Sequence, residues 1–269
     1  MSVIAGNWKM HMGPAKTRAF FAALRLDGVP PEHELLIFPP AVSLEAACSV
    51  RPPRVGIGVQ DVHWEDEGAF TGEVSASMAR EVGATFALVG HSERRHLFGE
   101  TDEQVARKTA AVVRNGLVPV VCVGETLAER RAGRVEEVIL RQLDAVLPKL
   151  AFLANASSSS SRSGSRSRAA PHAGARALIA YEPVWAIGTG ETATPSDASA
   201  AHATLRERLR QRLGEQAANA VPLLYGGSVK PDNARELLEA DEVQGVLIGG
   251  ASVEPGSFAA IAAVAPSGR

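Results

Sequence analysis

The chain has 269 residues, enough for one large domain or two small ones with a substantial core. Hydrophobic residues make up 45% of it and charged residues 22%, values typical of a globular protein that exclude a disordered or fibrous chain. The 28 Lys and Arg residues nearly balance the 30 Asp and Glu residues, so a net charge of -2 gives no reason to expect nucleic acid or a membrane as partner.

Short apolar runs rich in β-branched residues recur from one end of the chain to the other, and we predict a strand at each. The runs are apolar on both faces, which is typical of a parallel sheet covered by helices. The predicted strands span residues 3–5, 35–38, 55–59, 86–89, 118–123, 177–181, 221–225 and 246–248.

Helical patterns lie between these strands. Thr101 and Gln104 form a capping-box pattern that predicts a helix start, and Asn115-Gly116 predicts its end. Thr194-Pro195 predicts a second start, with proline at the first helical position. Two apolar stripes at helical spacing predict packing faces. They are Val135, Val138, Ile139, Leu143, Val146 and Leu150, and Ala201, Leu205, Leu209 and Leu213.

The alternation of strand and helix predicts one α/β domain over residues 1–269, folded as a closed (β/α)8 barrel, with an open doubly wound sheet as the alternative. Residues 156–175 break the pattern, because they are rich in Ser, Arg, Gly and Ala and poor in apolar side chains. We predict a flexible insertion in a helix-to-strand loop. The alternative is an arginine-serine arm that binds an acidic partner.

Residues capable of chemistry follow five of the predicted strands. A barrel enzyme draws its catalytic groups from the C-terminal ends of several strands, so this placement favours the barrel. Asn7 and Lys9 follow the first strand, His91 and Glu93 the fourth, and Glu182 the sixth. Glycine-rich turns, Gly226-Gly227-Ser228 and Gly249-Gly250, follow the seventh and the eighth.

These residue types point to one kind of chemistry. Glycines after the last two strands let backbone amides approach an anion, so we predict a phosphorylated ligand. Gly188-Thr189-Gly190 follows the stiff Pro183-Val184-Trp185 segment, a pattern that favours a lid over the ligand. A carboxylate base that faces an imidazole and an ammonium group suits proton abstraction next to a carbonyl.

Four separated motifs resemble the triosephosphate isomerase family, in the family's order. The resemblance runs from Val3 to about Ala263 and leaves out residues 156–175. The motifs are Gly6-Asn7-Trp8-Lys9-Met10, Gly90-His91-Ser92-Glu93-Arg94-Arg95, Tyr181-Glu182-Pro183-Val184-Trp185-Ala186-Ile187-Gly188-Thr189-Gly190 and Tyr225-Gly226-Gly227-Ser228-Val229-Lys230.

The resemblance implies a TIM barrel that interconverts dihydroxyacetone phosphate and D-glyceraldehyde 3-phosphate through an enediolate, with no cofactor and no metal. Glu182 would move the proton between carbons, and Lys9 would stabilise negative charge. His91, kept neutral by a helix N-terminus, would polarise the carbonyl and shuttle protons between oxygens, and the family is itself a standard example of this device. Asn7 would orient the oxygens, and Glu93 would be a further carboxylate at the site. The phosphate would be received by backbone amides of Gly188, Ser228, Gly249 and Gly250.

The resemblance also implies a homodimer, because Phe70-Thr71-Gly72-Glu73 resembles the segment that reaches into the other subunit in this family. The sequence departs from the family pattern at three positions. Glu191 replaces a common lysine at the C-terminal hinge of the lid, while His11 and Asp61 each replace a common asparagine. None of the three removes a catalytic group, so we expect effects on lid kinetics and on details of the subunit contact.

Two other functions stay open: a non-catalytic binder of phosphorylated ligands on the same fold, and another phosphate-binding barrel isomerase. The presence of Glu182, His91 and Lys9 together favours the enzyme over the binder, and the motif order disfavours the other isomerases. We expect a cytoplasmic location. Cys48 and Cys122 are too few for a disulfide framework and form no zinc-binding pair, and neither a signal peptide nor an apolar run of ~20 residues occurs.

Overall fold

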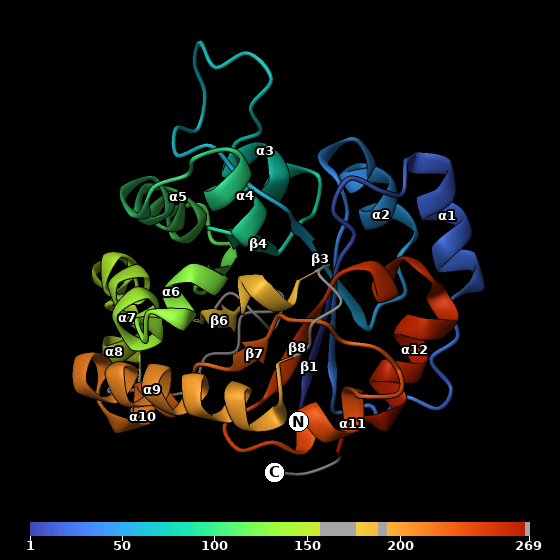
Figure 1. The fold of residues 1–269 in the computed structure, drawn as a ribbon. Helices are drawn as coiled ribbons and strands as arrows, with labels where there is room; N and C mark the ends of the chain where they lie inside the picture. The colour runs from blue at the N-terminus through green and yellow to red at the C-terminus, as the bar shows by residue number, and fades with distance from the viewer. Residues whose placement is uncertain (157–175, 188–192, 267–269) are drawn as a thin grey trace, which may run out of the picture.

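The strands of this protein form one closed barrel. The computed structural model describes residues 1–156, 176–187 and 193–266. All pairs of neighbouring strands are parallel, and the last strand pairs with the first (Figure 1). This closure confirms the (β/α)8 TIM barrel and is incompatible with the open doubly wound sheet. The strands are β1 (Val3–Asn7), β2 (Glu34–Phe38), β3 (Val55–Val59), β4 (Phe86–Val89), β5 (Val118–Val123), β6 (Leu178–Tyr181), β7 (Leu223–Tyr225) and β8 (Gly245–Ile248).

Side chains alternate between the interior of the barrel and the layer of helices around it. On β1 and β2, Val3, Ala5 and Leu36 belong to the interior cluster, while Ile4 and Leu35 pack in the outer cluster against the helices. Both sets are buried, which explains why the strands are apolar in every position rather than alternating.

The helices surround the barrel and follow the sequence patterns closely. The capping box at Thr101 forms with both of its hydrogen bonds, and Thr194 caps the helix that begins at Pro195. The helices are α1 (Pro14–Ala23), α2 (Leu44–Val50), α3 (Ala76–Glu81), α4 (Ser92–Leu97), α5 (Asp102–Arg114), α6 (Leu127–Arg131), α7 (Val135–Val146), α8 (Phe152–Ala156), α9 (Pro195–Leu213), α10 (Glu215–Asn219), α11 (Ala234–Glu239) and α12 (Pro255–Val264). Short 3₁₀ turns are η1 (Ala41–Ser43), η2 (Leu147–Lys149), η3 (Val184–Ala186) and η4 (Gly250–Val253).

Some boundaries differ from those predicted. β1 continues to Asn7, and β7 begins only after Pro222, which has no backbone N–H to give to the ladder. α7 ends at Val146 because Pro148 interrupts the helix, so Leu150 of the predicted stripe lies beyond it. Of the predicted insertion, Ala156 is the last residue of α8, and residues 157–175 lie outside the described part of the chain.

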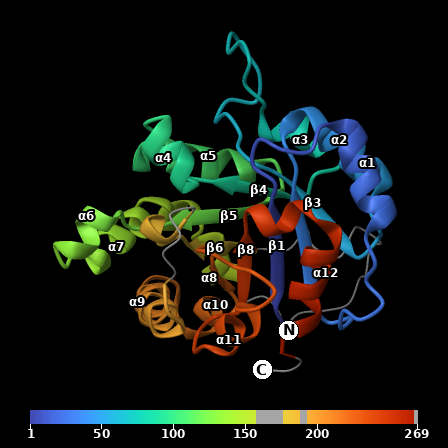
Figure 2. The ribbon, with the colours of Figure 1, turned by 45° about the vertical axis from the view of Figure 1, so that its right-hand side comes forward.

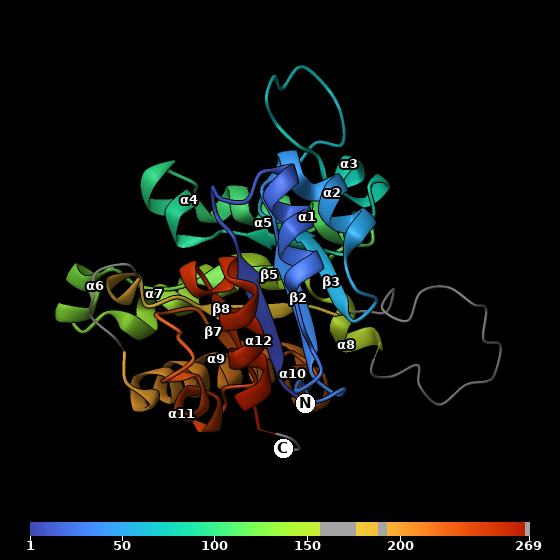
Figure 3. The same cartoon turned by 90° about the vertical axis from the view of Figure 1, so that its right-hand side faces the viewer.

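The segment between β3 and α3 extends away from the barrel, as Figures 2 and 3 show from two sides. Its two ends are held together by a bridge between His63 and Ser75. In the described part of the chain, no helix is long and apolar enough to cross a membrane.

Candidate active site

The residues predicted for the site gather at the C-terminal ends of the strands. Asn7, Lys9, His91 and Glu182 line a cavity of about 340 Å³, together with Gly226, Gly227, Ser228, Gly249 and Gly250. A second cavity of about 330 Å³ shares Asn7, Lys9 and His91 and is also lined by Glu93. Gly188 and the rest of the predicted lid motif up to Glu191 lie outside the described residues.

Glu182 is the buried carboxylate of this site. It follows β6 directly, is 2% exposed, and has its Oε1 3.0 Å from Nε2 of His91. Its Oε2 accepts the backbone N–H of Ser92 at 2.8 Å. Burial alone would raise the pKa of Glu182, but the His91 ring and the Ser92 amide hold it below the usual value.

His91 is the N-cap of α4, where its Nδ1 accepts the N–H of Glu93 at 3.2 Å. Since Nδ1 is an acceptor, the proton of the neutral ring is on Nε2, which faces Glu182. The helix N-terminus disfavours a charged His91 ring, but the carboxylates next to the ring act in the opposite direction. Burial, the largest single influence, lowers that pKa, but the carboxylates of Glu182 and Glu93 together outweigh it, and the pKa of His91 is raised.

Lys9 occupies a strained backbone conformation. Its φ of 51° is in the left-handed region, which is uncommon for a residue other than glycine and is a feature of functional sites. Asn7 Oδ1 accepts the Lys9 N–H at 3.0 Å, and Gln60 Nε2 donates to the Lys9 carbonyl at 2.9 Å. The ammonium group lies 2.7 Å from Oε1 of Glu93. These contacts fix Lys9 at the mouth of the cavity.

Two further residues close to Glu182 were not predicted from the sequence. Cys122, on the interior face of β5, is fully buried; burial raises the pKa of its thiol, and the neighbouring Glu182 carboxylate raises it further. Glu125 accepts Trp185 Nε1–H at 2.9 Å and Tyr181 O–H at 3.0 Å. It thereby holds η3, the segment that follows Glu182. Their positions in the sequence could have indicated this role, because both residues lie on or just after β5, at the end of the barrel where Glu182 also lies.

Glycine is required where the backbone of the site is crowded. A Cβ on Gly124 would lie 1.8 Å from the carbonyl oxygen of Glu182, and one on Gly226 would lie 2.8 Å from Cγ of the same residue. Any side chain at either position would displace Glu182. The glycines after β5 and β7 therefore allow the chain to pack directly against Glu182.

Asp61, one of the three departures from the family pattern, joins a partly buried cluster of ion pairs. Its carboxylate lies 2.7 Å from Lys108 Nζ and 2.8 Å from Arg94 Nε, and Lys108 also pairs with Glu100. Burial raises the pKa of Asp61 in spite of the neighbouring Lys108. The cluster joins the end of β3 to α4 and α5, and Asp61 and Arg94 also line the second cavity beside Lys9 and Glu93.

The described residues contain no group of three His, Cys, Asp or Glu side chains placed to hold a metal ion. Groups able to move protons do lie together: a buried carboxylate, a buried imidazole and a half-buried ammonium group around a cavity rimmed by glycines. The arrangement can take a proton from a carbon and stabilise an adjacent oxyanion.

Comparisons with known proteins agree with this geometry. The family model described as triosephosphate isomerase matches residues 2–265. A triosephosphate isomerase of Solibacter usitatus is 46% identical over 96% of this chain and 97% of its own length. Those of Halorhodospira halophila and Moorella thermoacetica are 47% and 44% identical, covering 99% and 96% of this chain and 98% and 96% of theirs. The chain belongs to the triosephosphate isomerase family.

Proposed function

We propose that Glu182, His91 and Lys9 carry out the triosephosphate isomerase reaction, which is this chain's activity as a member of the family. The observation that carries this assignment is the contact between Glu182 Oε1 and His91 Nε2, 3.0 Å apart in a cavity that Lys9 also lines. The proposal is supported by the presence of a carboxylate, an imidazole and an ammonium group around a space of about 340 Å³, which suits a small ligand.

The proposed proton transfers follow from the hydrogen-bond partners of Glu182 and of the two ring nitrogens of His91. When substrate binds, its carbonyl oxygen takes the place of Glu182 Oε1 as acceptor of the Nε2–H of His91. The released carboxylate removes the proton from the neighbouring carbon, and negative charge develops on the oxygens near Lys9. Nδ1 stays occupied by the Glu93 amide, so Nε2 alone exchanges protons with the two oxygens. Glu182 then returns its proton to the other carbon.

The phosphate group is proposed to lie at the glycine-rich end of the same cavity. Ser228, Gly249 and Gly250 line it there, and their backbone amides are suited to an anion. Ser252 Oγ donates to the Gly249 carbonyl at 2.7 Å, and Trp8 Nε1 donates to the Ser252 carbonyl at 2.9 Å. These bonds hold the β8 turn against β1, so the phosphate end and the Lys9 end keep a fixed separation.

We also propose a homodimer, because large apolar side chains are exposed around the mouth of the barrel. Met10 is 94% exposed, Val42 76% and Phe98 71%. Met10 and Val42 also line an apolar groove of about 920 Å³. Gly72 lies in the segment between β3 and α3, residues 60–75, which we call the projecting segment, and it lines the same cavity as Lys9 and His91. A second copy of the chain would cover these side chains next to the site.

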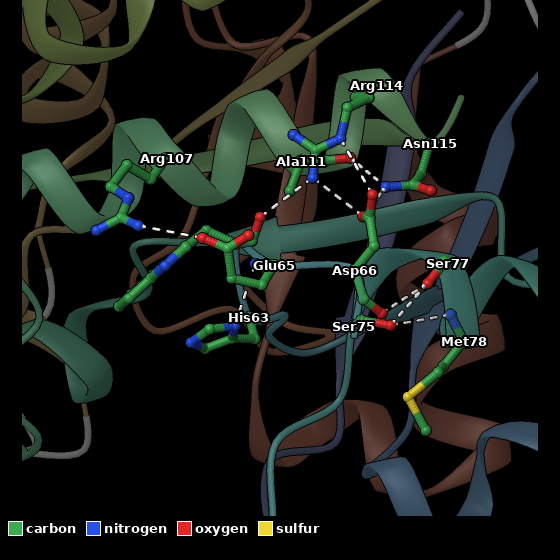
Figure 4. Close-up of polar contacts among 11 residues, drawn as sticks. His63, Glu65, Asp66, Ser75, Ser77, Met78, Arg107, Ala111, Arg114 and Asn115 are labelled. Atoms are coloured by element: carbon green, nitrogen blue, oxygen red, sulfur yellow. Dashed lines mark hydrogen bonds and ion pairs between the residues drawn. The ribbon is translucent and has the colours of Figure 1, made fainter. Parts of the chain in front are cut away.

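The projecting segment is held in shape before any partner binds, as Figure 4 shows. Asp66 accepts hydrogen bonds from Arg114 at 3.0 Å and Asn115 at 2.7 Å, both at the end of α5. The centroids of the His63 and Phe70 rings lie 4.0 Å apart. Such ordering reduces the entropy that association would otherwise cost.

The proposed reaction also bears on the location and the partners of the protein. The reaction is a step of glycolysis and gluconeogenesis, which supports a cytoplasmic location, and the free thiols of Cys48 and Cys122 suit a reducing compartment. The proposed partners are a phosphorylated triose and a second copy of the chain. No cofactor or metal has a role in the proton transfers described above.

The experiment is a coupled assay of glyceraldehyde 3-phosphate conversion by the purified protein, with its mass measured by light scattering in the same buffer. We expect turnover by a dimer. Background turnover by folded, dimeric protein would contradict the function. Turnover by a monomer would leave the reaction intact and contradict the dimer.

A further inference from the structure

Lys230 lies at the rim of the active-site cavity and has no role in the proton transfers described above. Its side chain is exposed and lines the same cavity of about 340 Å³ as Ser228 and Lys9. Within the described part of the chain, no carboxylate forms an ion pair with Lys230.

The other charges of this cavity are already paired. Lys9 Nζ lies 2.7 Å from Glu93, and the carboxylate of Glu182 lies 3.0 Å from His91. Among the described residues that line this cavity, Lys230 therefore remains the cation without an acidic partner. An unpaired charge at the rim of a low-dielectric cavity attracts an approaching ion of opposite sign more strongly than a paired one.

The backbone beneath Lys230 is held in place. Asn233 Oδ1 accepts the N–H of Lys230 at 2.8 Å, while Asn233 Nδ2 donates to the carbonyl of Ser228 at 3.0 Å. One side chain, just before α11, thus holds both Ser228 and Lys230 in the connection between β7 and α11. The Lys230 stem consequently starts from a fixed point next to Ser228, where the phosphate is proposed to bind.

We propose that Lys230 is a further substrate-binding residue, which captures the phosphate dianion as the substrate enters and guides it toward Ser228. The inference rests on the proposed function and adds to it the step of electrostatic capture. Lys230 takes no part in the chemistry, so its charge raises kcat/KM and leaves kcat to Glu182 and His91.

The test compares Lys230→Gln and Lys230→Arg with the wild-type protein at two salt concentrations. At about 0.01 M salt, where charges act over about 30 Å, we expect Lys230→Gln to lower kcat/KM by about threefold to tenfold with kcat within about twofold. At about 1 M salt, where charges act over only about 3 Å, the difference in kcat/KM between Lys230→Gln and the wild-type protein should nearly vanish. Lys230→Arg keeps the charge and should retain most of kcat/KM at low salt.

Lys149→Gln is the matched control. It removes the same charge from an exposed position in η2, on a helix-to-strand connection at the opposite end of the barrel. We expect wild-type kcat/KM and wild-type salt dependence for this variant. An equal loss in both variants would show that only net charge matters and would overturn a role for this position.

Binding of inorganic phosphate, measured by calorimetry, separates this inference from the proposed function. We expect weaker binding by Lys230→Gln than by the wild-type protein or Lys149→Gln. Equal phosphate affinity together with an unchanged salt dependence of kcat/KM would overturn the inference while the isomerase stayed active. If the wild-type protein lacked turnover, the proposed function would fail, and the phosphate comparison would still decide whether Lys230 binds the anion.

Discussion

Glu182 and His91 contact each other through the atoms that the proposed reaction uses. Oε1 of the carboxylate lies 3.0 Å from Nε2 of the imidazole, and Oε2 is bonded to the Ser92 amide. The proton that His91 would offer to a substrate carbonyl is therefore given to the base. In the proposed reaction the substrate therefore has to separate the two groups before either one acts.

The first prediction concerns the pKa of His91. Glu182→Gln removes the negative charge that raises this pKa, while burial, which lowers it, remains. The pKa of His91 should therefore fall, and the ring should stay neutral to lower pH than in the wild-type protein. NMR titration of the ring nitrogens measures the change. His202, buried elsewhere in the barrel, is the internal control and should not shift. A His91 pKa that stayed the same would mean that the contact is absent in solution.

A second prediction concerns acid stability. His202 is fully buried, and burial lowers its pKa from 6.5 to about 4. As the pH falls below about 6.5 the unfolded chain takes up this proton first, so the free energy of unfolding decreases until about pH 4. For this residue the loss is about 3 kcal/mol at most.

Denaturant unfolding between pH 4 and 7 tests this prediction with His202→Gln, which cannot become charged. Its unfolding free energy should depend less steeply on pH than that of the wild-type protein, even if the variant is less stable throughout. His96→Gln removes an exposed histidine and serves as the control. Parallel pH profiles for His202→Gln and the wild-type protein would contradict the assignment.

A third prediction concerns the projecting segment. Asp66→Ala removes the acceptor that Arg114 and Asn115 share, so the segment between β3 and α3 is held less firmly against α5, where the bond from Arg114 to the Trp64 carbonyl remains. We expect the dimer dissociation constant to rise by about threefold to tenfold, which is about 1 kcal/mol, as measured by analytical ultracentrifugation. Glu67→Ala changes a neighbouring exposed carboxylate and should leave the constant unchanged. The same rise in both variants would show that total charge, rather than the contact with α5, is responsible.

A fourth prediction concerns the Ser/Arg-rich stretch. It connects α8 to the start of β6, whereas Glu182 follows the other end of that strand. Deleting residues 157–168 should therefore keep kcat/KM within about twofold and leave stability equal or slightly higher, because loop length changes closure entropy only slowly. Steady-state kinetics and thermal unfolding measure both effects. A tenfold loss of activity, or a dissociated dimer, would show that the stretch packs against a subunit.

Local rules predicted the elements of this fold well. Thr101 and Thr194 are caps because their side chains bond to amides three residues later, a relation that lies wholly within the sequence. The predicted start of β7 and the predicted end of α7 were less accurate. Pro222 acts through the missing hydrogen bond to a neighbouring strand, and Pro148 acts through the hydrogen bonds of the preceding helical turn.

The environment of the site was harder to predict. The sequence places His91 at a helix start, but the sign of its pKa change depends on Glu182, which comes from another strand. Gln60 and Cys122 reach the site through barrel closure and strand register, which no local pattern contains. The identity of the site residues could thus be predicted from the motifs, whereas the direction of the pKa change of His91 required the assembled barrel.

The central claim is that Glu182 takes the proton from carbon. The most direct measurement is kcat of Glu182→Gln in the coupled assay, since the substitution keeps the shape of the side chain and removes its basicity. We predict a kcat lower by about 10²- to 10⁴-fold, with substrate affinity changed far less. A loss of less than about tenfold would contradict the claim and assign the proton transfer to another group.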